Sequence, residues 1–434
     1  MIRSKAALIS KKSITLFGRK YSIRSFLQNA LILNSILVLL GNNIGNFIAY
    51  IYHLVFGRIL GPSMYGDLAA FVSVITLAGT AFSFFNLVIV RYSAMYSKHE
   101  NVIFFKWIRR LSIIVGIVVG VVLVLSSGVI SDFTHINSQT ALIVGPVVAL
   151  SIITMAHKSF LQGLVRFKQV VISNNLELLL RLFISLLFVY MGLQVFGVAL
   201  GYLVASLLGF TLLTYYLRDI RSLKTVKKFT HSHKVYKYAI PVFLSSLATN
   251  SFFTTDVILA KHYLDPFQAG LYAALSNFGK ILFFATTPIA LVMFPLVAKK
   301  YKEGGNYRLL LYASIGMSLC VVTVVLLIYY FFPELMINLL FGSEYLAGSM
   351  YLFGFGVFMS IFVVAVLIIN FFLSIDKSKI VLVSLFASIV QIVGIMRFHN
   401  DIFQIIKVSI VASSVLLTGS IIYLIIDLRN EKTK

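Results

Sequence analysis

Apolar stretches of about 18 residues or more recur along the whole chain, and this feature constrains the fold more than any other. A helix of about 20 apolar residues crosses the roughly 30 Å hydrocarbon core of a bilayer. Lipid offers the backbone no hydrogen-bond partners, so a crossing segment must be a helix or part of a closed barrel. The short segments of alternating polarity that build barrels are missing from the sequence. The sequence therefore predicts an all-α polytopic membrane protein.

Composition supports the same fold class and excludes others. The chain is 59% hydrophobic and 12% charged, whereas soluble domains are about 45–50% apolar and about 25% charged. A net charge of +23 could indicate a nucleic-acid partner, but the charges are scattered among short loops, which favours a surface of anionic membrane lipids instead. The single cysteine, Cys320, excludes an intramolecular disulfide, and no Cys/His cluster has metal spacing. We therefore expect no metal and no cofactor.

Apolar runs between charged or turn-rich breaks predict about twelve transmembrane helices. The predicted spans are 27–56, 66–92, 111–131, 139–164, 170–193, 195–217, 236–261, 268–298, 309–332, 346–373, 378–396 and 402–427.

The distribution of Lys and Arg predicts the orientation of these helices. With both termini in the cytoplasm, all but six of the 37 Lys and Arg residues fall in the arm, the cytoplasmic loops with the span ends that border them, or the tail. This agrees with the excess of positive charge found in cytoplasmic loops, and it requires an even number of spans. The six exceptions are Arg58, Lys261 and Arg397 in outer connections and Arg181, Lys280 and Lys407 within spans. We predict a multi-pass protein of the cytoplasmic (inner) membrane with a retained basic arm.

An internal repeat divides the helices six and six. Residues 60–70 align with residues 264–274, because Leu, Pro, Gly and Ala-Ala recur at a constant offset of 204, and Asn46 meets Asn250 at that offset. Each copy is the outer hairpin between the first two helices of its half, with Pro and Gly placed as in a tight turn. The alternative explanation of this similarity is that unrelated helix hairpins share the same turn residues. The predicted parts are a basic arm (1–26), a six-helix bundle (27–217), a basic linker (218–235), a second bundle (236–428) and a tail (429–434).

Charged residues within or at the edge of the spans are candidate functional groups, because a charge in lipid usually faces a cavity or a partner. Glu177 and Arg181 are four residues apart and can pair on one helix face, as a structural pair or as a switchable one in a cavity. Asp256 fits a proton or cation site, or an ion pair with Lys261 or Lys280. The candidate cations of a substrate cavity are Arg58, Arg91, Arg181 and Lys280, and Glu177 and Asp256 are candidates for ion coupling. Cations outnumber anions, which suits an acidic cargo.

Asparagines are dense in the first span. Asn42, Asn43 and Asn46, with Asn250 at the repeat position, are candidates for binding sugar hydroxyls, although contacts between helices would explain them as well. The Gly41-x-x-x-Gly45 spacing permits close helix packing or a bend.

The segment Arg58-Ile59-Leu60-Gly61-Pro62-Ser63-Met64-Tyr65-Gly66 resembles the R-x-L-G-P-x-x-Y/F-G turn of polysaccharide-export proteins. These belong to the multidrug/oligosaccharidyl-lipid/polysaccharide (MOP) exporter superfamily, and Wzx-type flippases are the most similar in character. Residues 238–241 with Asp256, residues 264–272, and Phe294-Pro295 resemble the same family. The resemblance implies a MATE-like pair of six-helix bundles around a central cavity. It also implies movement of an undecaprenyl-diphosphate-linked oligosaccharide, such as an O-antigen or capsule repeat unit, to the outer leaflet by alternating access.

Three functions remain open. The first is this flippase, with a lipid-linked anionic glycan as substrate, membrane lipids as surroundings and the polysaccharide polymerase machinery as a candidate partner. The second is a cation-coupled multidrug exporter of the same superfamily. The third is a membrane glycan polymerase or ligase, which short outer loops without a catalytic constellation disfavour. We therefore predict a transporter and not an enzyme.

Overall fold

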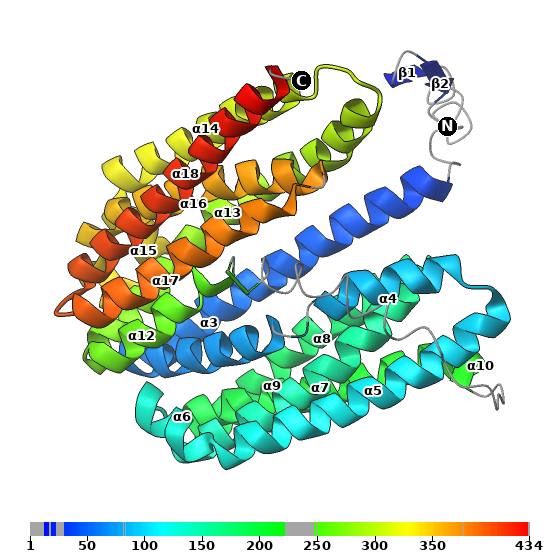
Figure 1. The fold of residues 1–434 in the computed structure, drawn as a ribbon. Coiled ribbons are helices and arrows are strands. Elements are labelled where there is room, and N and C mark those ends of the chain that lie inside the picture. The colour runs from blue at the N-terminus through cyan, green and yellow to red at the C-terminus, as the bar shows by residue number, and fades with distance from the viewer. Residues whose placement is uncertain are drawn as a thin grey trace, which may run out of the picture.

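A computed structural model describes residues 13–16, 19–22 and 30–432 except 81, 83, 222–246, 249 and 376. These described residues are almost entirely helical (Figure 1). A small antiparallel hairpin, β1 (Ser13–Leu16) and β2 (Arg19–Ser22), lies in the basic arm outside the helices.

The first half contains the helices α3 to α10. Their bounds are α3 (Ala30–Thr80), α4 (Phe84–Met95), α5 (Lys98–Leu125), α6 (Ser127–Thr134), α7 (Ser138–Gly163), α8 (Phe167–Phe188), a π-helical turn η1 (Val189–Leu193), α9 (Gln194–Tyr216) and α10 (Arg218–Arg221). The second half contains α12 (Thr255–Tyr263), α13 (Pro266–Lys302), α14 (Arg308–Phe331), α15 (Pro333–Leu340), η2 (Ser343–Gly348), α16 (Ser349–Ser374), η3 (Ser378–Ile380), α17 (Val381–Arg397) and α18 (Ile402–Lys432).

Nine helical stretches in the described part of the chain are long and apolar enough to cross a membrane. Two of these, Leu37–Thr80 and Phe167–Tyr216, reverse direction at a glycine with positive φ, Gly61 and Gly192, and so hold two crossings each. Helix α12 supplies the outer end of the predicted seventh span, whose residues 236–246 lie outside the described residues. The predicted polytopic helical fold is confirmed.

The two repeat copies turn by different local means. In the first copy Gly61 adopts φ 70°, which permits a sharp kink directly before Pro62. In the second copy Asp265 occupies the matching position, and its carboxylate caps α13 by accepting the backbone N–H groups of Phe267 and Gln268 at 3.0 and 3.1 Å. Both solutions give the tight hairpin that the sequence predicts.

The helices form two groups, which we call the N-lobe (α3 to α9) and the C-lobe (α12 to α18). Within the N-lobe α7 packs on α5, α4 and α9, and α8 packs on α9 and α3; within the C-lobe α16 packs on α13, α14 and α18. The lobes meet where α3 contacts α13 and α12. The predicted domain boundaries stay predictions, because most of the linker 218–235 lies outside the described residues.

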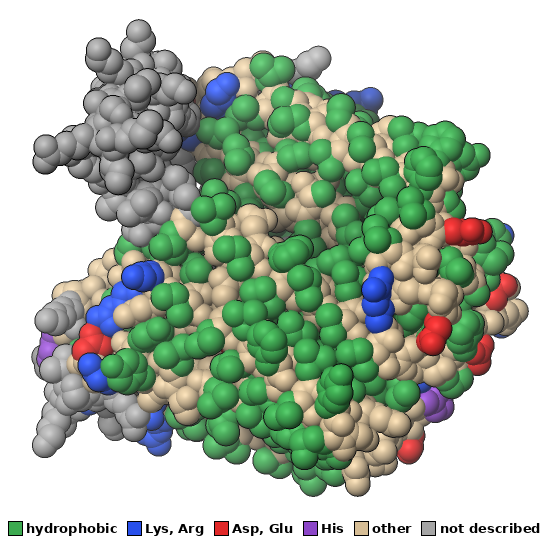
Figure 2. Space-filling view, turned by 180° about the vertical axis from the view of Figure 1, so that it is seen from behind, with side chains coloured by type: hydrophobic (Ala, Val, Ile, Leu, Met, Phe, Trp, Pro, Cys, Tyr) green, Lys and Arg blue, Asp and Glu red, His purple; other side chains and the backbone are tan. Residues whose placement is uncertain are grey.

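Basic and acidic side chains lie mostly at opposite ends of the molecule (Figure 2). Figure 1 shows the start of α3 and the end of α18 directed toward the same side, as an even number of crossings requires. On the face shown in Figure 2, most Lys and Arg lie toward one end and most Asp and Glu toward the other, with mainly hydrophobic side chains between them. The excess of positive charge assigns the end with the termini to the cytoplasm. We call the opposite end the outer end.

Candidate functional site

A polar cavity of about 580 Å³ lies in the cytoplasmic half of the N-lobe. Its walls come from α3, α4, α7, α8 and Asn250. Lys158 and Glu177 are the charged residues among those that line it, and the other polar lining residues are neutral amides and hydroxyls. These neutral residues are Asn42, Thr76, Thr80, Asn86, Ser151, Thr154, Ser159, Gln162, Asn174 and Asn250.

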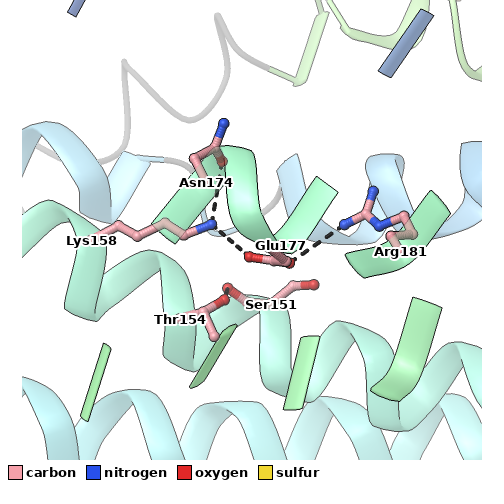
Figure 3. A network of polar contacts seen from close by, with 6 residues as sticks. All are labelled: Ser151, Thr154, Lys158, Asn174, Glu177 and Arg181. Carbon is pink, nitrogen blue, oxygen red and sulfur yellow. Dashed lines mark hydrogen bonds and ion pairs between the residues drawn. The ribbon is translucent and has the colours of Figure 1, made fainter. Parts of the chain in front are cut away.

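Glu177 is paired with two cations, as Figure 3 shows. Its Oε2 atom lies 2.8 Å from Lys158 Nζ on α7, and its Oε1 atom lies 3.4 Å from Arg181 Nη2 one turn further along α8. Lys158 Nζ also donates to Asn174 Oδ1 at 3.3 Å. Glu177 is only 8% exposed, and a buried carboxylate requires such compensation. The predicted Glu177–Arg181 pair is therefore present, with Lys158 as a second partner.

Arg181, the second partner of Glu177, also contacts an aromatic ring. Its guanidinium stacks on the Tyr202 ring with Cζ 3.4 Å from the ring centroid, which is cation–π geometry. Arg181 is not among the residues that line the cavity, whereas Lys158 and Glu177 are. Helix α9 packs closely on this carboxylate, because a Cβ at Gly209 would lie 3.1 Å from Glu177 Oε2.

Helix α3 packs closely on α8 through Gly41 and Gly45. A Cβ at Gly41 would lie 2.2 Å from Val171 Cγ1, one at Gly45 would lie 2.7 Å from Asn175 Oδ1, and the Asn175 amide donates to the Gly41 carbonyl at 3.1 Å. The predicted close-packing role of this Gly-x-x-x-Gly spacing is confirmed.

The candidate asparagines separate in the structure. Asn42 and Asn250 line the cavity. Asn43 donates to the Leu39 carbonyl of its own helix at 2.8 Å, and Asn46 is exposed without lining the cavity.

Two of the candidate cations lie away from the cavity. Arg58 is at the outer end, where its guanidinium donates to the carbonyls of Asn338, Leu339 and Leu340 at the end of α15. Arg91 is exposed on α4 and does not line the cavity. The sequence-based set of cations therefore does not gather in one place, because the set was chosen by depth along the spans and not by helix face.

Lys280 and Asp256 belong to the C-lobe. Lys280 on α13 lies within electrostatic range of Asp256 and His53. Asp256 is 1% exposed and accepts a hydrogen bond from the Tyr272 hydroxyl at 2.9 Å. The expected pairing of Asp256 with Lys261 is wrong, because the Lys261 ammonium binds Asp67 Oδ1 at 2.7 Å instead.

The outer end is closed by direct contact between the two repeat copies. A Cβ at Gly66 would lie 3.1 Å from the Gly270 nitrogen, and one at Gly270 would lie 1.9 Å from the Pro62 carbonyl oxygen. The Lys261–Asp67 ion pair joins the lobes at this point, and the Tyr345 hydroxyl donates to the Gly57 carbonyl at 2.8 Å. The cavity thus lies on the cytoplasmic side of a closed outer contact.

A polar chain crosses the lobe interface below this contact. Asn277 Nδ2 on α13 donates to the Tyr65 hydroxyl at 2.6 Å, and that hydroxyl lies 3.2 Å from His53 Nδ1 on α3. Tyr65 and Asn277 are buried. Separation of α3 from α13 would break this chain.

Lys158 is the charged cavity residue that sequence reasoning missed. Its position near the end of α7 led to its assignment to a cytoplasmic loop. A signal was available in the polar stripe Ser151, Thr154, Lys158 and Gln162, whose spacings of three, four and four residues place them on one helix face.

The sequence matches the family described as polysaccharide biosynthesis protein over residues 31–301. The chain belongs to this family. The predicted family is thereby confirmed, and a search of curated proteins finds no match.

Solved structures show the same fold. The lipid II flippase MurJ in an inward closed conformation matches with a TM-score of 0.73 at 14% identity, covering 91% of this chain and 87% of that one. An inward-facing MATE-family multidrug resistance transporter of the MOP superfamily matches with a TM-score of 0.71 at 14% identity, covering 89% and 96%. A MOP-superfamily transporter from Pyrococcus furiosus, described by the reversed polarity of its binding pocket, matches with a TM-score of 0.61 at 15% identity, covering 91% and 95%. The expected MATE-like architecture is confirmed.

Proposed function

We propose that the protein moves a lipid-linked oligosaccharide from the inner to the outer leaflet of the cytoplasmic membrane by alternating access. The observation that carries this proposal is the polar cavity with its ion-paired lysine, which lies on the cytoplasmic side of a closed outer contact. Family membership supports the same conclusion, because the matched family is one of polysaccharide biosynthesis.

The chemistry of the cavity suits a sugar head group. Its amides and hydroxyls offer both donors and acceptors to sugar hydroxyls. Lys158 adds a cation that can bind a phosphate or carboxylate. A cavity for lipophilic cations would instead need an excess of negative charge, and Glu177 is already neutralised by two cations.

Helix α3 has the two faces that a lipid-linked cargo requires of a cavity wall. Asn42 and Asn46 lie on one face, and the exposed Leu40, Ile44 and Phe47 lie on the opposite face at helical spacing. Between these faces Gly41 and Gly45 pack on α8. Such a wall lets a head group lie in a polar space while its hydrocarbon chain stays in lipid.

Three of the candidate charged groups keep a proposed role. Arg181 is proposed to hold the carboxylate of Glu177, Lys280 to add positive potential around the head group, and Asp256 to couple transport to a proton or cation. Asp256 is supported by its burial within the C-lobe, where its carboxylate accepts a hydrogen bond from the Tyr272 hydroxyl. Arg58 is better explained as a contact that closes the outer end.

Deletion of the gene followed by analysis of the lipid-linked glycans tests the proposal. We expect one such glycan to accumulate in the inner leaflet, and we expect the full chain expressed from a plasmid to restore its export. The Lys158→Gln variant should restore export poorly at an equal protein level. Efflux of a lipophilic cation by expressing cells, with unchanged glycan export in the deletion strain, would instead support a multidrug exporter.

A further inference from the structure

The carboxylate of Glu177 is shared unequally between Lys158, which lines the cavity, and Arg181, which does not. Glu177 Oε2 lies 2.8 Å from Lys158 Nζ, whereas Glu177 Oε1 lies 3.4 Å from Arg181 Nη2. Figure 3 shows the two cations approaching the carboxylate from opposite sides. Lys158 is the partner that a cargo in the cavity can reach.

Arg181 has unused capacity to bind this carboxylate. A guanidinium carries five N–H donors and can hold a carboxylate through two parallel hydrogen bonds. Here a single Nη2 contact to Glu177 is formed, and Arg181 Nε is buried without a hydrogen-bond partner in the described part of the chain. The Tyr202 ring fixes the guanidinium beside the carboxylate. Because Glu177 and Arg181 are one turn apart on α8, the carboxylate can move onto Arg181 by side-chain rotation alone.

Lys158 also has a place for a new partner. Its ammonium has three donors, two of which are used by Glu177 Oε2 and Asn174 Oδ1. An anion that entered the cavity would meet both the ammonium and the like charge of Glu177. Tight binding of that anion therefore requires Glu177 to leave Lys158. A neutral ligand lacks the negative charge that would replace the Glu177 carboxylate beside the ammonium.

We propose that Glu177 is an exchangeable counter-ion that selects for cargo with an acidic group. The phosphate or carboxylate of the cargo takes the place of Glu177 on Lys158, and Glu177 closes onto Arg181, which acts as its positioning residue. This inference rests on the proposed function, since it concerns the same cavity, and it adds the basis on which cargo is selected.

Equilibrium binding to the purified full chain in lipid nanodiscs tests the exchange. The probes are farnesyl diphosphate with farnesol as its neutral counterpart, and tri-galacturonic acid with maltotriose as its neutral counterpart. Tighter binding of the diphosphate alone assigns the acidic group to the lipid linkage, and tighter binding of the acidic sugar alone assigns it to the glycan; either outcome supports the exchange. Equal binding of each acidic probe and its neutral counterpart would overturn it.

Substitutions then separate the exchange from a structural ion pair. Lys158→Gln should weaken binding of the acidic probe by about 10- to 100-fold, the usual effect of losing a hydrogen bond to a charged group. Glu177→Gln should strengthen that binding by about tenfold, because the competing charge is gone. Asn174→Asp, which places a new carboxylate beside Lys158 without altering Glu177, should weaken it by a similar factor. The neutral probes should be unaffected in all three variants.

The decisive measurement is the effect of Arg181→Gln in two backgrounds. In the otherwise unchanged chain it should weaken acidic-probe binding by about tenfold, because Glu177 loses its second partner. In the Glu177→Gln background the same change should have little effect, and Arg181→Lys should retain binding. Equal weakening in both backgrounds would show that Arg181 has only a structural role, and the proposal would be wrong.

These outcomes can be distinguished from failure of the proposed function. Exchange observed with the probes, together with normal glycan export in the deletion strain, would leave the counter-ion role intact and transfer it to another acidic cargo. Loss of export in the deletion strain, together with acidic-probe binding that Glu177→Gln does not change, would overturn the counter-ion role alone.

Discussion

Gly270 is where a single methyl group should open the outer end of the protein. In Gly270→Ala the new Cβ would lie 1.9 Å from the Pro62 carbonyl oxygen, and an ordinary contact begins at 3.4 Å. The opposing atoms belong to backbone and cannot rotate away, so the two repeat copies must separate by about 1.5 Å, the difference between those distances. Overpacking of this kind costs about 1–3 kcal/mol. Helix propensity works in the opposite direction, since Ala favours a helix over Gly by up to about 1 kcal/mol.

The cost falls on the closed outer contact and not on a state in which the lobes have parted. An energy of about 1–3 kcal/mol shifts a two-state equilibrium roughly 5- to 150-fold. Gly270→Ala should therefore populate an outer-open arrangement at the expense of the closed one. The matched control is Gly316→Ala within α14, because a Cβ at Gly316 meets no atom within 4 Å.

Pulsed electron–electron spin resonance between two labelled cysteines measures this shift. Gln139 and Asn400 are exposed outer-end residues of the N-lobe and the C-lobe, and the exposed native Cys320 can be replaced by serine. We expect Gly270→Ala to lengthen the distance between labels at 139 and 400, and Gly316→Ala to leave it unchanged. A folded Gly270→Ala protein with an unaltered distance distribution would refute the reasoning, as would an equal change in the control.

Three further predictions concern charged groups. Asp67→Lys should open the outer end in the same spin-label measurement by placing a like charge beside Lys261, and the exchanged pair Asp67→Lys with Lys261→Asp should close it again; failure of the exchange to restore closure would contradict an electrostatic role. Asp256→Asn should abolish the dependence of export on a proton or sodium gradient while the protein still folds, because the amide can still accept the Tyr272 hydrogen bond; unchanged dependence would remove Asp256 from the coupling site. The hydrogen bond from Arg166 lowers the pKa of Asp219 outside the membrane, so this pair stabilises the fold above the ordinary Asp range and loses its contribution as the pH falls through the lowered pKa. Asp219→Asn should thus lower the melting temperature slightly at pH 7 and converge with the unsubstituted protein in acid, and a constant difference at every pH would contradict this.

The helical fold could be predicted because lipid leaves the backbone few options. Apolar length alone places the crossings, and the excess of Lys and Arg at one end sets their direction. The residue types at the two turns indicate a break between helices. Gly61 suits a φ of 70°, and Asp265 suits an exposed helix N-cap. These features depend on local chemistry, which a sequence shows directly.

The grouping of the charges could not be predicted in the same way. A transmembrane helix is apolar around most of its circumference, so the sequence barely indicates which face meets another helix. Arg58 and Arg181 both looked like cavity cations, yet one binds the end of α15 and the other stacks on Tyr202. Asp256 looked like a partner for Lys261, but the rotation of α12 directs it to Tyr272 on α13. Helix rotation is a product of packing between distant parts of the chain, and hydropathy does not record it.

The meeting of Gly66 with Gly270 has a consequence for how such a protein can evolve. Under the predicted duplication the two glycines are equivalent, and the contact has the form of an isologous dimer interface, in which a patch binds its own copy. In a dimer of single six-helix units, one mutation there would alter both sides at once. Fusion into one chain removes that restriction, and the neighbouring positions already differ, with Gly57 in one copy and Lys261 in the other. The resulting Lys261–Asp67 ion pair forms once rather than twice, because the matching positions are Gly57 and Leu271. The outer contact is therefore held by an ion pair on one side only.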